Sequence, residues 1–281
     1  MRESKFINIK GELMSLSTPR VMGIINLTAD SFYDGGKIKS DKDLLVKVER
    51  MMDDGVDILD VGAYSSRPGA IDIPMRNEWD AAVAGIDTIL KHFPKAILSI
   101  DTFRATVAKG ALEHGASIIN DISGGNLDKA MFDLVAEANV PYIMMHMKGN
   151  PQTMSSLAAY DDLLLEIIDY FNGKVSELRD RGVKDIIIDP GFGFAKTKEQ
   201  SFELLGKLEL LHILDVPMLC GVSRKSMIFK ELDIKADQAL NGTTALNMAC
   251  LLKGGSILRV HDVKETKETI KLYKAMIHSN T

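Results

Sequence analysis

The sequence predicts an α/β fold, a (β/α)8 barrel of the TIM type with a short N-terminal β-hairpin. Eight short runs rich in Ile, Val, Leu and Met recur along the 281 residues, and each run is apolar on both faces of the strand it would form. Parallel strands that are covered on both sides have this composition. Longer amphipathic segments separate the runs, and eightfold strand–helix alternation is typical of the barrel.

The predicted strands extend from residue 21 almost to the C-terminal end of the chain. Before them, "FINIK" and "ELMSL" flank Gly11 and predict a small hairpin that plugs the bottom of the barrel. The eight strands are expected at 21–28, 57–62, 96–102, 117–123, 141–147, 185–191, 216–223 and 256–262.

The segments between the strands predict helices with recognisable ends. Segment 41–55 begins with Asp41, which can cap a helix, and ends at Gly55. Segment 76–93 has apolar residues at helical spacing and stops before Pro94. Further helices are expected within 162–182, 236–255 and 264–278.

We assign residues 1–281 to a single domain, with the hairpin in 1–17 and the barrel in 18–281. No Gly/Ser-rich linker or change of composition divides the chain. The alternative architecture is a doubly wound open sheet, which usually has fewer strands.

Composition and charge exclude several classes of function. The net charge of −5 disfavours a nucleic-acid binder, so an anionic ligand must be met by a local group of cations. Cys220 and Cys250 lie in apolar surroundings and predict buried, reduced thiols. The N-terminus lacks the apolar run of a signal peptide, and no apolar stretch is long enough for a membrane span. We therefore expect a soluble, cytoplasmic protein with no membrane or nucleic-acid partner.

Polar side chains stand where nearly every predicted strand ends. In such barrels, residues at the C-terminal ends of the strands build the active site. A single Asp or Asn at a strand end is more often a helix cap, but a whole set favours a site. The set comprises Asn26, Asp60, Asp101, Asn120, Asp121, His146, Asp189, the segment 223–226, Arg259 and His261.

The members of this set divide by chemistry. Asp101, Asn120 and Asp189 offer acceptors and an amide, which suit a flat heterocycle with several N–H donors. Lys225, Arg259 and His261 supply positive charge for an anion. No HExxH, clustered CxxC, GxSxG or P-loop pattern occurs. His146 and His261 are too isolated to predict a zinc site.

Seven motifs occur in an order and spacing that resemble the dihydropteroate synthases of the bacterial, single-function type. They are "GIINLTADSFYDGG", "DVGAYSSRPGA", "SIDTFRATVAKGALEHGASIINDISGG", "MMHMKGNPQTM", "DPGFGFAKT", "GVSRKS" and "ILRVHDV", and the resemblance runs from about residue 6 to the C-terminus. It implies a TIM-barrel transferase of folate biosynthesis, a target of sulfonamides. Such an enzyme joins 6-hydroxymethyl-7,8-dihydropterin diphosphate to para-aminobenzoate and releases diphosphate and 7,8-dihydropteroate.

The resemblance assigns roles to most of the strand-end residues. It implies pterin binding by Asp101, Asn120, Asp189 and Lys225, and Asn26 as a ligand of Mg²⁺ beside the diphosphate oxygens. It implies diphosphate binding by Asn26, Ser66, Arg67, Arg259 and His261, and para-aminobenzoate binding by Phe32, Ser66, Pro68, Phe192 and Ser226. It also implies a homodimer. We expect Asp101, Lys225 and Arg259 to act in catalysis.

Two loop positions depart from the family pattern. Ser66 stands where threonine is more common, which keeps the hydroxyl and loses a methyl group. Ala29 stands where proline is usual, which removes a backbone restraint. Arg224, between the strand-end residues of "GVSRKS", is expected to be structural.

The expected chemistry is a substitution with a good leaving group. Mg²⁺, Arg259 and His261 would neutralise the departing diphosphate, and Asp101 would stabilise positive charge developing on the pterin. The aromatic amine is neutral and nucleophilic at pH 7, so no strong base is needed. Two alternative functions are a pterin-dependent methyltransferase, which needs no diphosphate site, and a catalytically silent paralogue.

Overall fold

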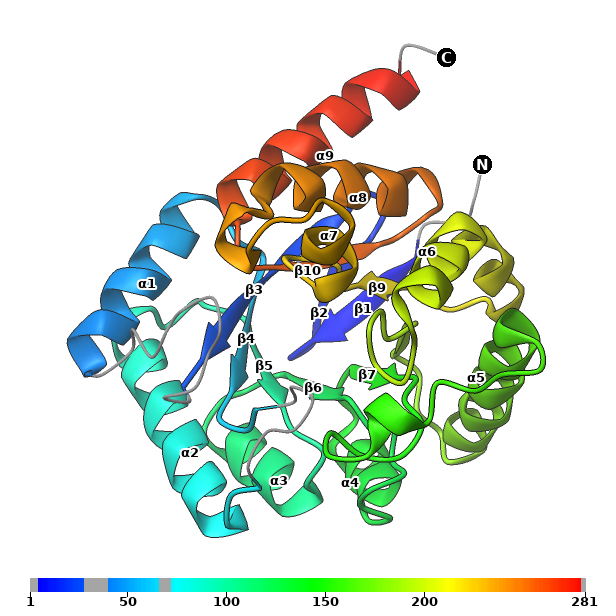
Figure 1. Cartoon of the computed structure of the whole chain (residues 1–281). Coiled ribbons are helices and arrows are strands. Elements are labelled where there is room, and N and C mark those ends of the chain that lie inside the picture. The colour runs from blue at the N-terminus through cyan, green and yellow to red at the C-terminus, as the bar shows by residue number, and fades with distance from the viewer. Residues whose placement is uncertain (1–4, 28–39, 66–71, 279–281) are drawn as a thin grey trace.

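A ring of parallel strands surrounded by helices forms the main body of the chain (Figure 1). The computed structural model describes residues 5–27, 40–65 and 72–278. The strands of the ring are β3 (Arg20–Asn26), β4 (Ile58–Gly62), β5 (Leu98–Asp101), β6 (Ile118–Asp121), β7 (Tyr142–Met145), β8 (Ile186–Asp189), β9 (Leu219–Cys220) and β10 (Ile257–Val260).

The ring follows the chain, and it nearly closes between its first and last members. The strand order is β8-β7-β6-β5-β4-β3-β10-β9, and every neighbouring pair is parallel. An isolated parallel bridge between Ile188 and Met218 joins β8 to the residue before β9. The predicted barrel is confirmed.

The predicted hairpin is also confirmed. Strands β1 (Phe6–Ile9) and β2 (Glu12–Ser15) pair antiparallel, and both turn residues, Lys10 and Gly11, have positive φ. The buried side chains of Ile7, Ile9 and Leu16 form one apolar cluster with residues of the barrel strands. These barrel residues are Met22, Ile58, Ile118, Ile143, Ile187, Leu219 and Ile257. The hairpin therefore fills the N-terminal end of the barrel.

Helices lie outside the strands and bury their apolar faces against them. They are α1 (Asp41–Asp53), α2 (Met75–His92), α3 (Ala105–Glu113), α4 (Met131–Ala138), α5 (Leu163–Asp180), α6 (Lys198–Gly206), α7 (Ser226–Glu231), α8 (Leu240–Leu252) and α9 (Val263–His278). Three short 3₁₀ segments, η1 (Met154–Ser156), η2 (Leu208–Leu214) and η3 (Ala236–Gln238), complete them. Among the described helices, none is both long and apolar enough to cross a membrane.

Two helix predictions need correction. Ser40, rather than Asp41, caps α1, because its side chain accepts the amide hydrogen of Asp43. The helix expected within 236–255 is two elements, η3 and α8. The assignment of residues 1–281 to one domain stays a prediction.

Candidate active site

The strand register brings the predicted polar residues to one end of the barrel. Asn26 pairs with Gly62, Gly62 with Asp101, and Asp101 with Asn120, so β3, β4, β5 and β6 end at the same level. Asp189 ends β8 in the same way, opposite Met145. Because all these strands are parallel, their polar ends gather at the C-terminal rim, as the sequence predicted.

Arg259 connects two buried carboxylates at this rim. Its Nε donates to Asp60 Oδ2 over 2.6 Å, and its Nη2 donates to Asp101 Oδ2 over 2.5 Å. Asn120 Nδ2 donates to the same Asp60 oxygen over 2.9 Å. Asp60 is fully buried, Asp101 and Asn120 are nearly so, and the Arg259 side chain is only 20% exposed. Four side chains from four strands thus form one network.

Burial and charge act in opposite directions on Asp101. Burial raises the pKa of Asp101 to about 7, and the nearby carboxylate of Asp60 adds to that rise. The guanidinium of Arg259 opposes it, because an adjacent positive charge favours the ionised carboxyl. Asp101 is therefore set to gain or lose a proton near neutral pH.

A second charged pair lies beside the first. A Cβ atom placed on Gly221 would lie 3.8 Å from both Asp189 Oδ2 and Lys225 Nζ and 4.0 Å from Arg259 Cβ, so the three side chains converge there. Burial raises the pKa of Asp189, while Lys225 opposes that change. Burial also lowers the pKa of Lys225 to about 8, against the effect of Asp189. Asp189 further accepts the amide hydrogen of Gly191 over 2.8 Å.

The loop after β8 places its two phenylalanines in different surroundings. Phe192, expected to touch para-aminobenzoate, has no exposed surface and belongs to the main hydrophobic core. Its carbonyl oxygen instead accepts a 2.6 Å hydrogen bond from Lys225 Nζ. Phe194 is partly buried, and its ring centroid lies 4.7 Å from Lys225 Nζ. Phe194 is therefore the aromatic side chain that this loop places beside Lys225.

A buried lysine that the sequence motifs did not single out holds this loop in place. Lys196 Nζ donates to the carbonyl oxygens of Gly191 and Phe194, both over 3.1 Å, and lies 2.9 Å from His146 Nδ1. Gly191 has φ +70°, and a Cβ there would come within 2.2 Å of the His146 carbonyl oxygen, so glycine is required.

Burial determines the protonation of His146 and Lys196. Burial lowers the pKa of His146 to about 2, and Lys196 lowers it further, so the imidazole is neutral and accepts at Nδ1. Burial lowers the pKa of Lys196 to about 7, against the effect of Asp189. His146 therefore supports the loop through its contact with Lys196.

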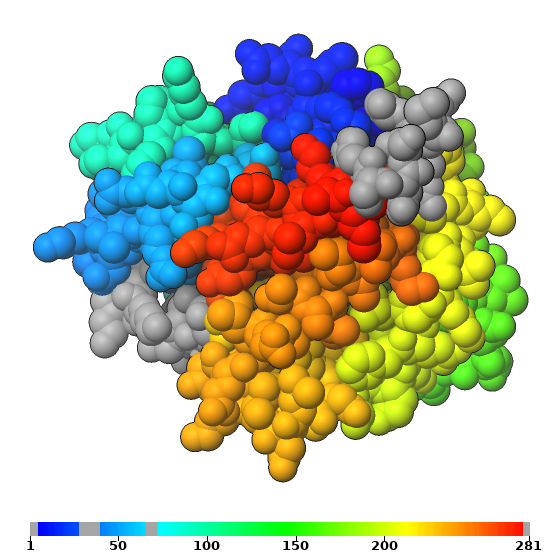
Figure 2. All heavy atoms as spheres, turned by 90° about the horizontal axis from the view of Figure 1, so that it is seen from above, coloured from blue at the N-terminus to red at the C-terminus, as the bar shows by residue number. Residues whose placement is uncertain are grey.

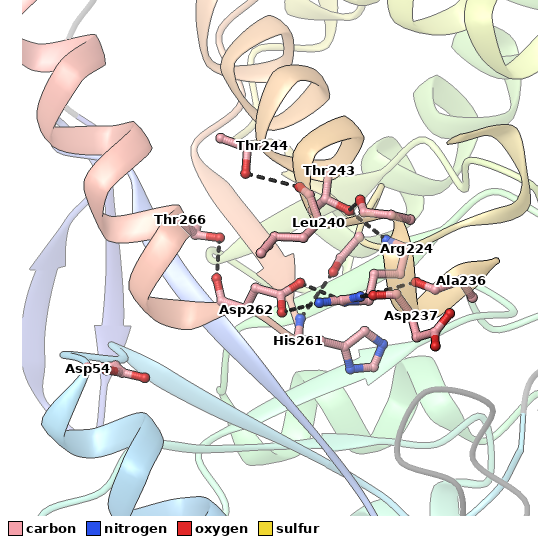
Figure 3. A network of polar contacts seen from close by, with 12 residues as sticks. Asp54, Arg224, Ala236, Asp237, Leu240, Thr243, Thr244, His261, Asp262 and Thr266 are labelled. Atoms are coloured by element: carbon pink, nitrogen blue, oxygen red, sulfur yellow. Dashed lines mark hydrogen bonds and ion pairs between the residues drawn. The ribbon is translucent and has the colours of Figure 1, made fainter. Parts of the chain in front are cut away.

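Arg224 anchors the turn that delivers Lys225 and Ser226. Its guanidinium donates to both oxygens of Asp262, over 2.8 and 2.7 Å, and to the carbonyls of Ala236 and Asp237 (Figure 3). Its backbone has φ +52°, a conformation that is unusual for a residue with a side chain. The prediction that Arg224 is structural is in line with these contacts.

The remaining predicted residues divide between rim positions and segments that the structure does not describe. Ser226 opens α7, and Asn26 is the last residue of β3. His261 follows β10, and its backbone N–H donates to Ser223 Oγ over 3.2 Å. The predicted loop residues Phe32, Ser66, Arg67 and Pro68, and the departure at Ala29, lie outside the described residues.

The residues present suit a magnesium ion that arrives with its anion. Asn26 offers an amide oxygen, the class of donor that Mg²⁺ prefers. Within 5–27, 40–65 and 72–278, no three His, Cys, Asp or Glu side chains are grouped as a metal site would need. A protein that supplies one oxygen leaves the other positions to water and phosphate oxygens, as is common for Mg²⁺.

Comparison with known proteins adds a family to this geometry. A family model described as pterin binding enzyme matches residues 22–261. The chain is 36% identical over 270 residues to the dihydropteroate synthase of Escherichia coli (strain K12), and the alignment covers 95% of each chain.

Two solved structures have the same fold along nearly the whole chain. The Yersinia pestis dihydropteroate synthase with a sulfonamide drug superposes with a TM-score of 0.93 at 34% identity, over 98% of this chain and 100% of that one. The Xanthomonas albilineans dihydropteroate synthase with 4-aminobenzoic acid gives 0.89 at 33% identity, over 97% and 98%.

Proposed function

This chain belongs to the dihydropteroate synthases, a family of pterin-binding enzymes, and we propose on that premise how its residues share the reaction. It is a transferase of folate biosynthesis, which condenses 6-hydroxymethyl-7,8-dihydropterin diphosphate with para-aminobenzoate to give 7,8-dihydropteroate and diphosphate. The observation that carries the division of roles is the convergence of Asp101, Asp189, Lys225 and Arg259 at one end of the barrel.

The pterin ring is bound by the acceptors at the strand ends. Asp101, Asn120 and Asp189 lie on β5, β6 and β8, and all three are buried. Carboxylate and amide oxygens match the N–H groups of a pterin, and burial makes each unmatched group costly, which gives specificity. Lys225, beside Asp189, contributes an ammonium group that reaches the ring.

The diphosphate is bound at the neighbouring strand ends. Arg259 and His261, at and just after the end of β10, supply the positive charge and donors. Asn26, at the end of β3, would hold Mg²⁺, which neutralises charge on the leaving group when it is bound. The guanidinium of Arg259 has five N–H groups, so its ion pairs with Asp60 and Asp101 leave donors for an anion.

The amine is placed by residues from two loops. The ring of Phe194 packs beside Lys225, and Ser226 opens α7 next to that lysine. We assign the para-aminobenzoate ring to Phe194, in place of Phe192, and its carboxylate to the hydroxyl of Ser226. 4-Aminobenzoic acid is the ligand named for the related Xanthomonas albilineans structure.

The reaction is a substitution at the exocyclic methylene of the pterin. The C–O bond to diphosphate breaks, the amine nitrogen forms a C–N bond at the same carbon, and the amine proton passes to solvent. Positive charge develops on the pterin as diphosphate departs, and the carboxylates of Asp101 and Asp189 stabilise it in a buried site.

We also propose that the enzyme is a cytoplasmic homodimer. Helices α8 and α9 lie side by side on the surface (Figure 2). Support for the dimer comes from the apolar side chains that these helices expose, among them Leu252, Leu272 and Met276. Both cysteines are free and buried, in keeping with a reducing compartment.

The proposal is tested by product formation from the purified chain. With Mg²⁺, pterin diphosphate and para-aminobenzoate, we expect diphosphate release that requires the amine and yields dihydropteroate. Asp101→Asn and Arg259→Ala should both abolish it, whereas Arg76→Ala, on the outer surface of α2, should not. Pterin binding without turnover would instead support a silent paralogue.

A further inference from the structure

Asp60 is a fully buried carboxyl in the middle of β4 to which the proposed mechanism gives no role. Its Oδ2 accepts two hydrogen bonds, one from Arg259 Nε and one from Asn120 Nδ2. Its Oδ1 is buried and receives no hydrogen bond from the described residues. Both donors belong to side chains that are proposed to bind substrate, so Asp60 contacts two substrate-binding residues without contacting the ligand itself.

This contact fixes which end of the Asn120 amide faces the ligand. An asparagine amide carries a donor and an acceptor of nearly equal shape, and its orientation is set by its hydrogen-bond partners. Asp60 Oδ2 already accepts from a guanidinium, so this oxygen has no proton to donate. The amide nitrogen must therefore face Asp60, because an amide oxygen there would oppose a carboxylate oxygen.

The opposite end of the amide is then an acceptor. With Nδ2 on Asp60, Asn120 Oδ1 joins the carboxylates of Asp101 and Asp189 as a third acceptor at the strand ends. Three acceptors in one site select a ring edge with N–H donors. A reversed amide would put two donors there and oppose such a ring.

We propose that Asp60 is a positioning residue that sets the hydrogen-bond polarity of Asn120 and thereby the preference of the site for a ring with N–H donors. The inference rests on the proposed pterin-binding function. Asp60 touches no substrate in this scheme, since it acts through Asn120 and Arg259. The inference extends the proposed function, because it names Asp60 as the residue that determines which end of the Asn120 amide contacts the pterin ring.

The chain offers a matched control at the other end of β4. Asp57 precedes β4 and is also a largely buried, ion-paired carboxyl, which lies 3.2 Å from Arg20 Nη1 and 2.5 Å from Lys267 Nζ. It stabilises the N-terminal end of the barrel and lies away from the rim residues. Asp57→Asn therefore reports what the loss of a buried, paired carboxylate costs in stability alone.

The experiment exchanges the two side chains of the pair. Binding of 6-hydroxymethylpterin, which lacks the diphosphate, is measured by calorimetry for the wild type, Asp60→Asn, Asn120→Asp and the double variant. Asn120→Asp alone places two carboxyls face to face, and the loss of a buried hydrogen bond to a charged group weakens binding by roughly tenfold to a hundredfold. In the double variant, the amide introduced on β4 donates to the carboxylate introduced on β6, which removes the repulsion, restores the hydrogen bond and keeps an acceptor toward the ring.

The expected result is rescue. If the two substitutions acted independently, their fold-increases in the dissociation constant for the pterin would multiply. The double variant should bind at least about tenfold more tightly than that product, which indicates direct coupling between the two side chains. Asp57→Asn should leave the dissociation constant within about twofold while lowering the midpoint of urea unfolding. If the Asp60→Asn single variant does not fold, the pterin affinity of Asn120→Asp is compared with that of the double variant. Tighter binding by the double variant still shows that Asp60 acts through Asn120.

Two other outcomes have distinct meanings. Additive effects, with no rescue in the double variant, would overturn the role of Asp60 while leaving the pterin site intact. A wild-type chain that binds no pterin would overturn the proposed function itself, and the role of Asp60 with it.

Discussion

Arg259, at the end of β10, forms an ion pair with Asp101, at the end of β5, across 158 residues of chain and a distance of 2.5 Å. The pair joins the group assigned to the diphosphate with a group assigned to the pterin. It also sets the ionisation of Asp101, because Arg259 counteracts a rise in pKa that burial causes. Substrate binding and proton loss at Asp101 are therefore linked.

We predict that pterin affinity depends on pH through Asp101. Below its pKa of about 7 the carboxyl holds a proton and accepts ring N–H groups poorly, so affinity should rise by up to about tenfold per pH unit toward pH 7 and then level off. Calorimetry with 6-hydroxymethylpterin from about pH 5.5 to about pH 7.5 spans this titration. Asp101→Asn should bind weakly at every pH, and the same slope in that variant would assign the titration elsewhere.

We predict that the two phenylalanines of the loop after β8 differ in function. Phe194→Ala should raise the KM for para-aminobenzoate roughly tenfold through the lost ring contact and leave the KM for pterin diphosphate unchanged. Phe192→Ala should lower the free energy of unfolding by about 3–5 kcal/mol, because it empties a fully buried site. Steady-state kinetics and urea unfolding of both variants separate these effects, and the reverse pattern would restore Phe192 to the site.

Lys196 should make stability depend on pH above neutrality. Its folded pKa of about 7 is below its ordinary value of 10.5, so between these values the unfolded chain binds the extra proton. The free energy of unfolding should thus rise with pH by about 1.4 kcal/mol per unit for this one proton. Urea unfolding from about pH 7.5 to about pH 9.5, within that interval, should show a shallower slope in Lys196→Met.

The control for this slope is Lys198, a partly exposed lysine that pairs with Glu231 on the surface. Lys198→Met should keep the wild-type slope. Equal slopes in wild type and Lys196→Met would mean that Lys196 keeps its proton throughout this range.

We predict that Arg224 contributes to stability far more than surface arginines do. Arg224→Ala leaves Asp262 buried without its bidentate partner, which typically costs about 3–5 kcal/mol, whereas Arg76→Ala, in the exposed pair with Asp80, should cost less than about 1 kcal/mol. In urea unfolding, the double change with Asp262→Asn should cost less than the sum of the two single changes. A strictly additive double variant would rule out the direct pair.

Asn26 should govern how much magnesium the enzyme requires. Asn26→Ala removes the proposed protein oxygen, so Mg²⁺ should bind more weakly when diphosphate is present, while Asn26→Asp keeps an oxygen at that place. Calorimetric titration of Mg²⁺ with and without diphosphate measures this. Identical magnesium affinities in all three chains would remove Asn26 from the metal site.

The repeating pattern of apolar runs was sufficient to predict the barrel. Each run in a parallel, doubly covered strand must be apolar on both faces, and this requirement leaves a pattern that a single sequence displays. The order of strands then follows from the chain, so the positions of Asp101, Asn120 and Asp189 at the ends of their runs were enough to place all three at one rim. Because all strands of the barrel are parallel, residues at the C-terminal ends of different strands lie at the same end of the barrel.

The features that the sequence did not indicate depend on local turns and on packing between distant loops. In "GFGF", Phe192 and Phe194 have nearly identical surroundings in sequence, yet the backbone has positive φ at Gly191 and Gly193 and only Phe192 is fully buried. Lys196 resembles a surface lysine in sequence, yet it is buried by the meeting of its own loop with His146 at the end of β7.

The hairpin that fills the N-terminal end of the barrel bears on how substrates enter and products leave. Ile7, Ile9 and Leu16 cover the strand starts as part of one buried apolar cluster, a surface that a charged substrate crosses unfavourably. We expect both substrates to enter at the opposite end, where the carboxylates lie. We therefore expect dihydropteroate and diphosphate to leave on the same side of the barrel by which their precursors arrived.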